Sequence, residues 1–236
     1  MLARTEGWWG RVDVSNFTDV AGISIHRLDT WHTEELAKPT FYQRFWKRAA
    51  DVVFAVVGLV VLLPVLLVIA GMVRVKLGPG VLYRQARVGR NGRNFVMLKF
   101  RTMQHRDRTD SEDEEAHEAT HKTSDHPRLT KFGRILRRLS LDELPQLWNV
   151  IRGQMSLVGP RPELSEKVDD HGLRAHPRHV VRPGLTGEWQ VTHRSSGIHL
   201  IHCFDEDMEY VSRINLWRDV RIILRTFSVV IGAKGI

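Results

Sequence analysis

The amino-acid sequence predicts a mostly helical α/β protein with a small β-hairpin, held on one face of a membrane as a monotopic protein. Residues 52–73 form an uncharged apolar run of 22 residues, enough to cross about 30 Å of hydrocarbon as a helix. Lys and Arg lie on both sides of this run, whereas a single span leaves one flank poor in them. Asn91 and Gly92 stand between two strand-like segments, a pattern typical of a hairpin. The sequence therefore predicts a re-entrant membrane helix followed by a compact domain.

The net charge and the cysteine content limit the kinds of partner and of site that the protein can have. The 236 residues include 35 Lys and Arg against 27 Asp and Glu, a formal net charge of +8. This excess indicates a polyanionic partner: a nucleic acid, an anionic membrane surface or a phosphorylated substrate. One cysteine excludes an intramolecular disulfide framework and a metal cluster built from cysteines.

The chain divides into three parts around the apolar run. Residues 1–40 are a mixed N-terminal extension, which we interpret as a candidate remnant of a preceding domain. Residues 41–76 carry the membrane helix, with Pro64 near its centre. Proline removes a helix hydrogen bond and clashes with the preceding turn, so a kink there would return the helix to the same leaflet. A simple kinked span and a buried core helix are the alternatives. Residues 77–236 form the compact domain.

That domain opens with the predicted hairpin and continues into a helix that precedes two acids. Residues 81–85 and 94–100 read as strands on either side of the Asn-Gly turn. After a charge-rich stretch at 104–126, read as a loop or an exposed helix, residues 131–139 read as an amphipathic helix. At the C-terminus, residues 205–231 read as a basic amphipathic helix, suited either to a membrane interface or to core packing.

Asp142 and Glu143 are the candidate reactive residues. Pro145 follows them and belongs in a first helical turn, which places both acids at or just before a helix N-terminus. Ser140 and Glu143 match a capping box, so a purely structural role is one interpretation. The other is catalytic, because arginines precede and follow the acids in the sequence. One carboxylate would then attack phosphorus while the other binds Mg²⁺.

Several ordered motifs resemble those of the bacterial sugar transferases, the monotopic phosphoglycosyl transferases, over about residues 42–236. They occur in the order typical of that family: Lys47-Arg48-x-x-Asp51 before the apolar run, Lys99-Phe-Arg-Thr-Met103, Asp125-x-Pro-Arg128, Ser140-Leu-Asp-Glu-Leu-Pro-Gln146, Met155-Ser-Leu-Val-Gly-Pro-Arg-Pro162 and Arg182-Pro-Gly-Leu-Thr-Gly187-x-Trp-Gln190. The resemblance implies transfer of a sugar 1-phosphate from a UDP-sugar to polyprenyl phosphate, with release of UMP. It also implies a catalytic domain on the cytoplasmic face of the bacterial inner membrane, as the first membrane step of polysaccharide or glycoconjugate synthesis.

The same resemblance assigns roles to individual residues. It implies that Asp142 is the nucleophile of a phosphosugar-aspartate intermediate and that Glu143 binds the cofactor Mg²⁺. Basic residues that match phosphate-binding positions are Arg137, Arg161, Lys99, Arg101 and Arg128. For these, contact with lipid headgroups alone is the competing interpretation. Residues expected to line a nucleotide or sugar pocket, or else to form a tight structural turn, are Pro183, Gly184, Thr186 and Gln190.

Expected partners are the UDP-sugar, polyprenyl phosphate and membrane lipids, with a second copy of the chain and later glycosyltransferases as further candidates. Two rival functions remain: a membrane-tethered protein that uses its basic face on a nucleic acid, and a scaffold without catalytic turnover. Nucleic acid is not expected as a partner, because the sequence contains no helix-turn-helix, zinc-finger or RNA-stacking motif.

Overall fold

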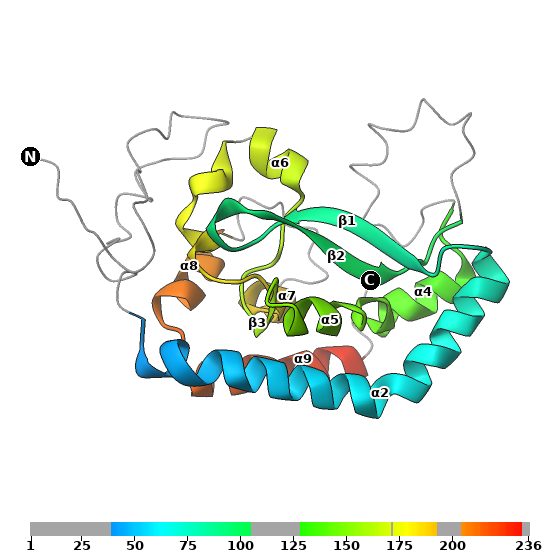
Figure 1. Ribbon diagram of the computed structural model, residues 1–236, viewed down its shortest axis with the longest axis horizontal. Helices are drawn as coiled ribbons and strands as arrows, with labels where there is room; N and C mark the ends of the chain where they lie inside the picture. Colours follow the sequence, from blue (N-terminus) through cyan, green and yellow to red (C-terminus); the bar gives the residue numbers. More distant parts are fainter. Residues whose placement is uncertain (1–38, 105–127, 171, 193–203, 233–236) are drawn as a thin grey trace, which may run out of the picture.

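The computed structural model describes residues 39–104, 128–170, 172–192 and 204–232 of the chain. Within these residues the protein is mostly helical with two small two-stranded sheets, which confirms the predicted fold class in its coarse form (Figure 1). The elements in chain order are α2 (Lys47–Leu77), β1 (Leu82–Val88), β2 (Asn94–Phe100), α4 (Lys131–Arg138), α5 (Gln146–Ile151), β3 (Ser156–Val158), α6 (Ser165–Asp170), β4 (Gly184–Thr186), α7 (Glu188–Thr192), α8 (Phe204–Ser212) and α9 (Leu216–Ile231).

The apolar run forms one continuous helix, α2, with Pro64 inside it. In Figure 1 this helix follows the lower edge of the molecule and then changes direction. It is long and apolar enough to cross a membrane, and most of its apolar side chains are exposed, among them Val61 at 68% and Val75 at 84%. Exposure of this kind differs from that of a core helix. The return of the helix to the same leaflet stays a prediction.

Polar side chains near the start of α2 fasten it to the domain. Arg48 donates hydrogen bonds to the carbonyl oxygens of Val150 and Ile151, at 2.7 and 3.0 Å, and so satisfies the C-terminal end of α5. The buried Asp51 accepts a hydrogen bond of 2.7 Å from the hydroxyl of Ser156. Helix α2 and the rest of the domain are therefore joined through both α5 and β3.

The hairpin forms where the sequence predicts it. Strands β1 and β2 pair antiparallel from Leu82–Phe100 to Val88–Asn94, and Asn91 adopts a left-handed conformation at φ 57°, which asparagine tolerates better than most residues. The side-chain amide of Asn149 then ties α5 to β2, because its Oδ1 accepts from Leu98 N at 3.0 Å and its Nδ2 donates to Val96 O at 2.7 Å. This bridge places the strand that carries Lys99 beside the helix that follows the acids.

The structure differs from the sequence-based expectation at Ser140. This residue adopts a left-handed conformation at φ 57° and its side chain makes no capping hydrogen bond to the turn that follows. Its backbone carbonyl accepts from Glu143 N instead, at 3.2 Å. The predicted capping box is therefore wrong, because the Ser140 side chain does not cap the turn and its backbone is left-handed. Asp142 and Glu143 lie in the short 3-10 turn Leu141–Glu143 that connects α4 to α5.

The C-terminal region differs in a second way. The single predicted helix over 205–231 is two helices, α8 and α9, separated by residues 213–215. The side chain of Asn215 accepts a hydrogen bond from Arg218 N at 2.9 Å and starts α9 anew, as an N-cap residue does. The parallel pair β3–β4 was not predicted at all, since each strand has only three residues. The predicted N-terminal extension, 1–40, lies almost entirely outside the described residues.

Candidate functional site

Asp142 is a buried carboxyl group, 8% exposed, in the turn between α4 and α5. Burial and, to a smaller extent, the adjacent Glu143 raise its pKa to about 6, against the opposing effects of Lys99, Arg137 and a backbone hydrogen bond. In the part of the chain that the structure describes, no other side chain donates a hydrogen bond to this carboxylate. Its oxygens therefore remain available to a ligand, and the ionised form is costly without one.

Glu143 sits beside Asp142 and forms an ion pair with Lys99, with 2.9 Å between Oε1 and Nζ. Both partners are partly exposed, at 28% and 20% of their side chains. Among the described residues no group of three or more His, Cys, Asp and Glu side chains could hold a metal ion. Mg²⁺ commonly takes only one or two carboxylates together with substrate phosphates. Two adjacent acids, one of which raises the pKa of the other, fit such a shared site.

A narrow polar recess opens beside Glu143. Its walls come from β1, β2, α5 and the segments that flank β3 and β4, and they are formed by Arg87, Met97, Lys99, Glu143, Gln146, Arg161, Pro162, Gly184, Leu185 and Gln190. Three of these side chains are cations and one is an acid, so the recess favours an anionic ligand. The structure thus brings together Glu143, Lys99, Arg161, Gly184 and Gln190 from the sequence-predicted set.

Arg161 is held in the recess by contacts on several sides. Its guanidinium lies 5.0 Å from the ring centre of Trp189 and 3.9 Å from a carboxylate oxygen of Glu163. Behind it, the fully buried Arg178 donates a 2.7 Å hydrogen bond to the carbonyl oxygen of Arg161 and pairs with the buried Asp207 at 2.5 Å. This support fixes the backbone from which Arg161 reaches the recess.

The segment around β4 supplies the far wall of the recess through its backbone. An added Cβ on Gly184 would collide with backbone atoms of Gly159, so glycine is required by this close approach. Pro183 accepts a hydrogen bond from Ser156 N at 2.8 Å, and the Thr186 hydroxyl lies 2.7 Å from that of Thr226. Pro183 and Thr186 thus shape the wall, whereas Gly184 and Gln190 line it.

The remaining predicted basic residues lie elsewhere. Arg137 is half-buried beside Asp142, and its Nε donates to the hydroxyl of Thr102 at 3.0 Å. Arg101 donates to the carbonyl oxygens of Leu77 and Gly78 at 2.5 and 2.8 Å, so it satisfies the C-terminal end of α2. Arg128 adjoins the strand bridge between Met103 and Leu129.

Sequence reasoning missed two residues of the recess. Gln146 is 3% exposed and belongs to a motif that was quoted without a role for this residue. Arg87 was counted only among the basic residues after the membrane segment. Its Nη1 donates to the carbonyl oxygen of Pro162 at 3.1 Å. Only its position on β1, three residues from the exposed Arg84, hinted that it faces the other side of the hairpin.

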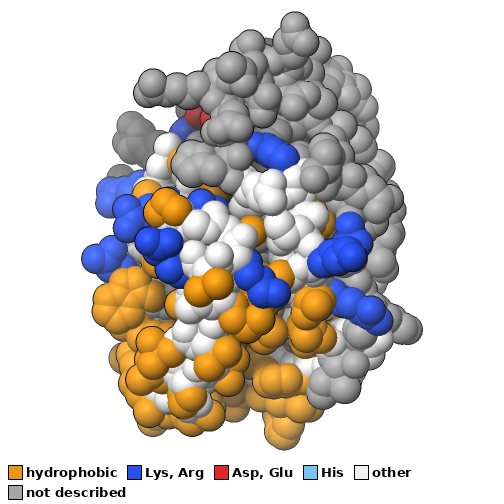
Figure 2. Space-filling view, turned by 90° about the vertical axis from the view of Figure 1, so that its right-hand side faces the viewer, with side chains coloured by type: hydrophobic (Ala, Val, Ile, Leu, Met, Phe, Trp, Pro, Cys, Tyr) orange, Lys and Arg blue, Asp and Glu red, His pale blue; other side chains and the backbone are white. Residues whose placement is uncertain are grey.

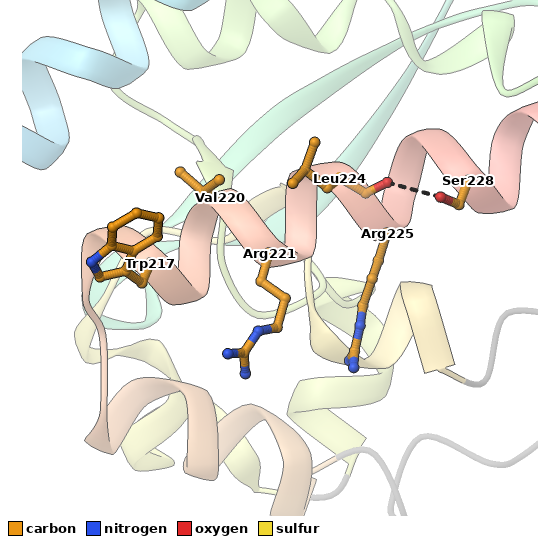
Figure 3. Close-up of a pocket in the computed structure, with 6 residues that line it drawn as sticks. All are labelled: Trp217, Val220, Arg221, Leu224, Arg225 and Ser228. Atoms are coloured by element: carbon orange, nitrogen blue, oxygen red, sulfur yellow. Dashed lines mark hydrogen bonds between the residues drawn. The ribbon is translucent and has the colours of Figure 1, made fainter.

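A second, more open hollow lies on the surface of α9. It is lined by Trp217, Val220, Arg221, Leu224, Arg225 and Ser228. In Figure 3, Val220 and Leu224 project from one side of the helix and Arg221 and Arg225 from the opposite side. Figure 2 shows a similar separation on a larger scale, with apolar side chains gathered along the lower part of one face and Lys and Arg side chains above them. The arrangement is amphipathic and contains no acid.

Comparison with known proteins agrees with the motifs. Residues 42–233 match the family described as bacterial sugar transferase. The chain is 37% identical over 227 residues to a UDP-galactose-lipid carrier transferase of Erwinia amylovora, which covers 92% of this chain and 47% of that protein. It is 39% identical over 197 residues to the exopolysaccharide production protein ExoY of Sinorhizobium fredii, covering 80% and 87%.

A third relative is the UDP-glucose:undecaprenyl-phosphate glucose-1-phosphate transferase of Xanthomonas campestris pv. campestris, 38% identical over 198 residues, which is 80% of this chain and 39% of the relative. The chain therefore spans less than half the length of the Erwinia and Xanthomonas proteins.

Proposed function

Because the chain belongs to the bacterial sugar transferase family, we propose that it transfers a sugar 1-phosphate from a UDP-sugar to polyprenyl phosphate and releases UMP. The observation that carries the proposal is the buried carboxylate of Asp142, which lies beside Glu143 with Lys99 and Arg137 close enough to lower its pKa. A diphosphate substrate would bring negative charge to these cations and phosphorus to the carboxylate.

The proposed reaction has two steps at one phosphorus atom. An oxygen of Asp142 attacks the phosphorus that carries the sugar. A bond forms between these two atoms, the bond to the bridging oxygen breaks, and UMP leaves with the electron pair. An oxygen of polyprenyl phosphate then attacks the same phosphorus, which frees the carboxylate and yields the lipid-linked sugar diphosphate. Mg²⁺ bound by Glu143 would neutralise charge on the diphosphate.

Burial supports Asp142 rather than Glu143 as the nucleophile. Glu143 is engaged by Lys99 at 2.9 Å, and its exposed position beside the recess suits a residue that shares a cation with the substrate. Asp142 is poorly solvated, and a desolvated carboxylate attacks more readily because no tight water shell has to be removed.

We also propose that α2 and α9 hold the active site at the cytoplasmic face of the inner membrane. α2 exposes a long apolar surface, and α9 exposes Leu216, Trp217, Leu224 and Phe227, which suits a helix lying in a membrane interface. A lipid-borne acceptor phosphate would then meet the cations beside Asp142 at the membrane surface. Dimerisation and transfer of the product to later glycosyltransferases stay predictions.

The direct test is UMP release from a panel of UDP-sugars by protein held in nanodiscs, with Mg²⁺ and undecaprenyl phosphate. We expect release with at least one sugar and none with Asp142→Asn, while Asp170→Asn, an exposed acid on α6, keeps the wild-type rate. Equal release by wild type and Asp142→Asn would refute the assigned nucleophile. No release with any sugar would favour the scaffold without turnover.

A second measurement separates the covalent route from direct displacement. Without polyprenyl phosphate, wild-type protein should release UMP up to one equivalent of enzyme and then stop, because Asp142 stays occupied by the sugar phosphate. A direct transfer between donor and acceptor gives no such burst. Release that continues without acceptor would indicate hydrolysis. Salt-dependent binding of nucleic acid that is unaffected by Asp142→Asn would instead favour the rival binding function.

A further inference from the structure

Arg87 places a buried guanidinium in the recess, and burial disfavours its charged form. Two of its nitrogens are engaged: Nη1 donates to Pro162 O at 3.1 Å and Nη2 to Gln85 Oε1 at 2.7 Å. The third, Nε, is buried without a partner among the described residues. Burial lowers the pKa of this guanidinium to about 10, Glu163 acts against that effect, and Arg161 adds to it. The group remains charged at neutral pH.

The recess holds three cations, Arg87, Arg161 and Lys99, against two nearby acids. Glu163 lies 3.9 Å from Arg161 and also acts on Arg87, whereas Glu143 pairs with Lys99. Like charges held together at a partly desolvated site destabilise the empty protein, and an anion between them removes that repulsion.

The two sides of the acid pair differ in their cations. Lys99 and Arg137 act on Asp142, whereas Arg87 and Arg161 line the recess beside Glu143, which Asp142 and Arg137 do not line. The phosphorus that Asp142 attacks would then lie near Arg137. The neighbouring phosphate of a diphosphate, displaced away from the nucleophile, would lie on the Glu143 side, where the recess opens.

We propose that Arg87 and Arg161 form a two-arginine site for the phosphate that leaves with the nucleotide, so that the same pair binds the donor's nucleotide phosphate and the product UMP. The inference rests on the proposed function. It adds Arg87 to the binding site and assigns different arginines to the two phosphates of the donor. Arg87 and Arg161 bind the departing phosphate, and Arg137 serves the phosphate under attack. Two arginines offer forked donors that match phosphate oxygens.

The test is direct binding of UMP to nanodisc-held protein by calorimetry, which needs no turnover. Arg87→Gln and Arg161→Gln should each weaken UMP binding about 10- to 100-fold, the usual loss for a hydrogen bond to a charged group. Arg84→Gln removes the same charge from an exposed position on the same strand. It should bind UMP within about threefold of wild type, by the same scale.

Two further variants keep the outcome decisive. Arg87→Lys keeps the charge without the fork and should bind UMP between wild type and Arg87→Gln. If replacing Arg87 unfolds the protein, Arg161→Gln carries the test. The inference would be overturned if Arg87→Gln, or folded Arg161→Gln, bound UMP with the same affinity as Arg84→Gln. The proposed function would then remain intact. Absence of UMP binding to wild-type protein would count against the proposed function itself.

Discussion

Two buried aspartates, Asp142 and Asp219, show opposite uses of a carboxylate. Asp219 of α9 is 4% exposed and accepts three hydrogen bonds at 2.7–2.8 Å, from the hydroxyls of Tyr42 and Tyr210 and from Lys47 Nζ. Asp142 is 8% exposed and has no such donor among the described side chains. Its surrounding cations act on it through space. The two carboxylates are similarly buried, and they differ in the number of hydrogen bonds that they accept from side chains.

This difference indicates what each residue is for. A carboxylate that accepts several short hydrogen bonds stabilises the fold and is held by its donors rather than free to attack a substrate. Asp219 joins the start of α2 to α8 and α9, so it fixes α2 against the rest of the domain. A buried carboxylate to which no side chain donates a hydrogen bond is costly to the fold and leaves its oxygens more accessible to a substrate. Such local cost is typical of functional sites.

Removing the saturated carboxylate should have the largest effect on stability. Asp219→Ala removes the acceptor of Lys47 and of the Tyr42 hydroxyl and one of the two acceptors of the Tyr210 hydroxyl, and loss of one partner of a buried ion pair costs about 3–5 kcal/mol. Thermal unfolding in nanodiscs would measure this loss, with Asp170→Ala as the exposed control. A melting temperature of Asp219→Ala equal to that of the control would mean that the cluster does not fasten α9 to α2.

Neutralising the unsatisfied carboxylate should act in the opposite direction. Asp142→Asn removes a charge whose pKa is raised by burial, so at pH 7.5 the variant should melt at the same temperature as wild type or higher, although UMP release is lost. The same unfolding experiment measures it. A lower melting temperature would show that Asp142 stabilises the fold as Asp219 does, and would remove the contrast.

The ion pair beside Asp142 offers an intermediate case. Lys99 and Glu143 are partly exposed, and such pairs contribute about 1 kcal/mol or less to stability. Lys99→Met should therefore change the melting temperature little. UMP release should fall roughly 10- to 100-fold, because a hydrogen bond to a charged group is lost and two acids remain side by side. Lys131→Met, exposed on α4, is the matched control, and equal rates in both variants would contradict this role.

Local signals in the sequence predicted much of this architecture. The hairpin depends on an Asn-Gly turn, and the membrane helix on an unbroken apolar run; both are properties of neighbouring residues. The acids were found because an Asp-Glu pair before a proline is itself a short pattern. The sequence also indicated that arginines surround the acids, although it could not assign each arginine to its partner.

Long-range contacts account for what was missed. Arg87 reaches a carbonyl oxygen 75 residues away, and Arg101 satisfies the end of a helix that precedes it by more than twenty residues. The pair β3–β4 exists because Gly159 and Gly184 allow two backbones to touch, a property of the folded chain. Ser140 was misread because its backbone is left-handed and its side chain makes no capping hydrogen bond, which the residue pattern alone does not reveal.

The buried histidines His176 and His179, which lie near Arg178, give the smallest expected effect. This effect is a dependence of the free energy of unfolding on pH. Burial lowers the pKa of His176 to about 3 and that of His179 to about 2, and in each case Arg178 adds to the effect. The folded protein therefore cannot take up the protons that the unfolded chain binds below its ordinary histidine pKa of about 6.5. Stability from these groups is complete above that pH and is lost as the pH falls.

This loss can be isolated between pH 7.5 and 6. Asp207 has a pKa raised to about 6 by burial, against the effect of Arg178, and its contribution has the opposite sign and develops mainly at lower pH. Each buried histidine should cost about 0.8 kcal/mol of stability over this interval. His179→Leu should therefore lose less stability than wild type between the two pH values, whatever its absolute melting temperature. If the stability of the two proteins changed equally with pH, His179 would take up a proton in the folded state. Its burial would then not exclude the charged form, in contrast to the raised pKa of the buried Asp142.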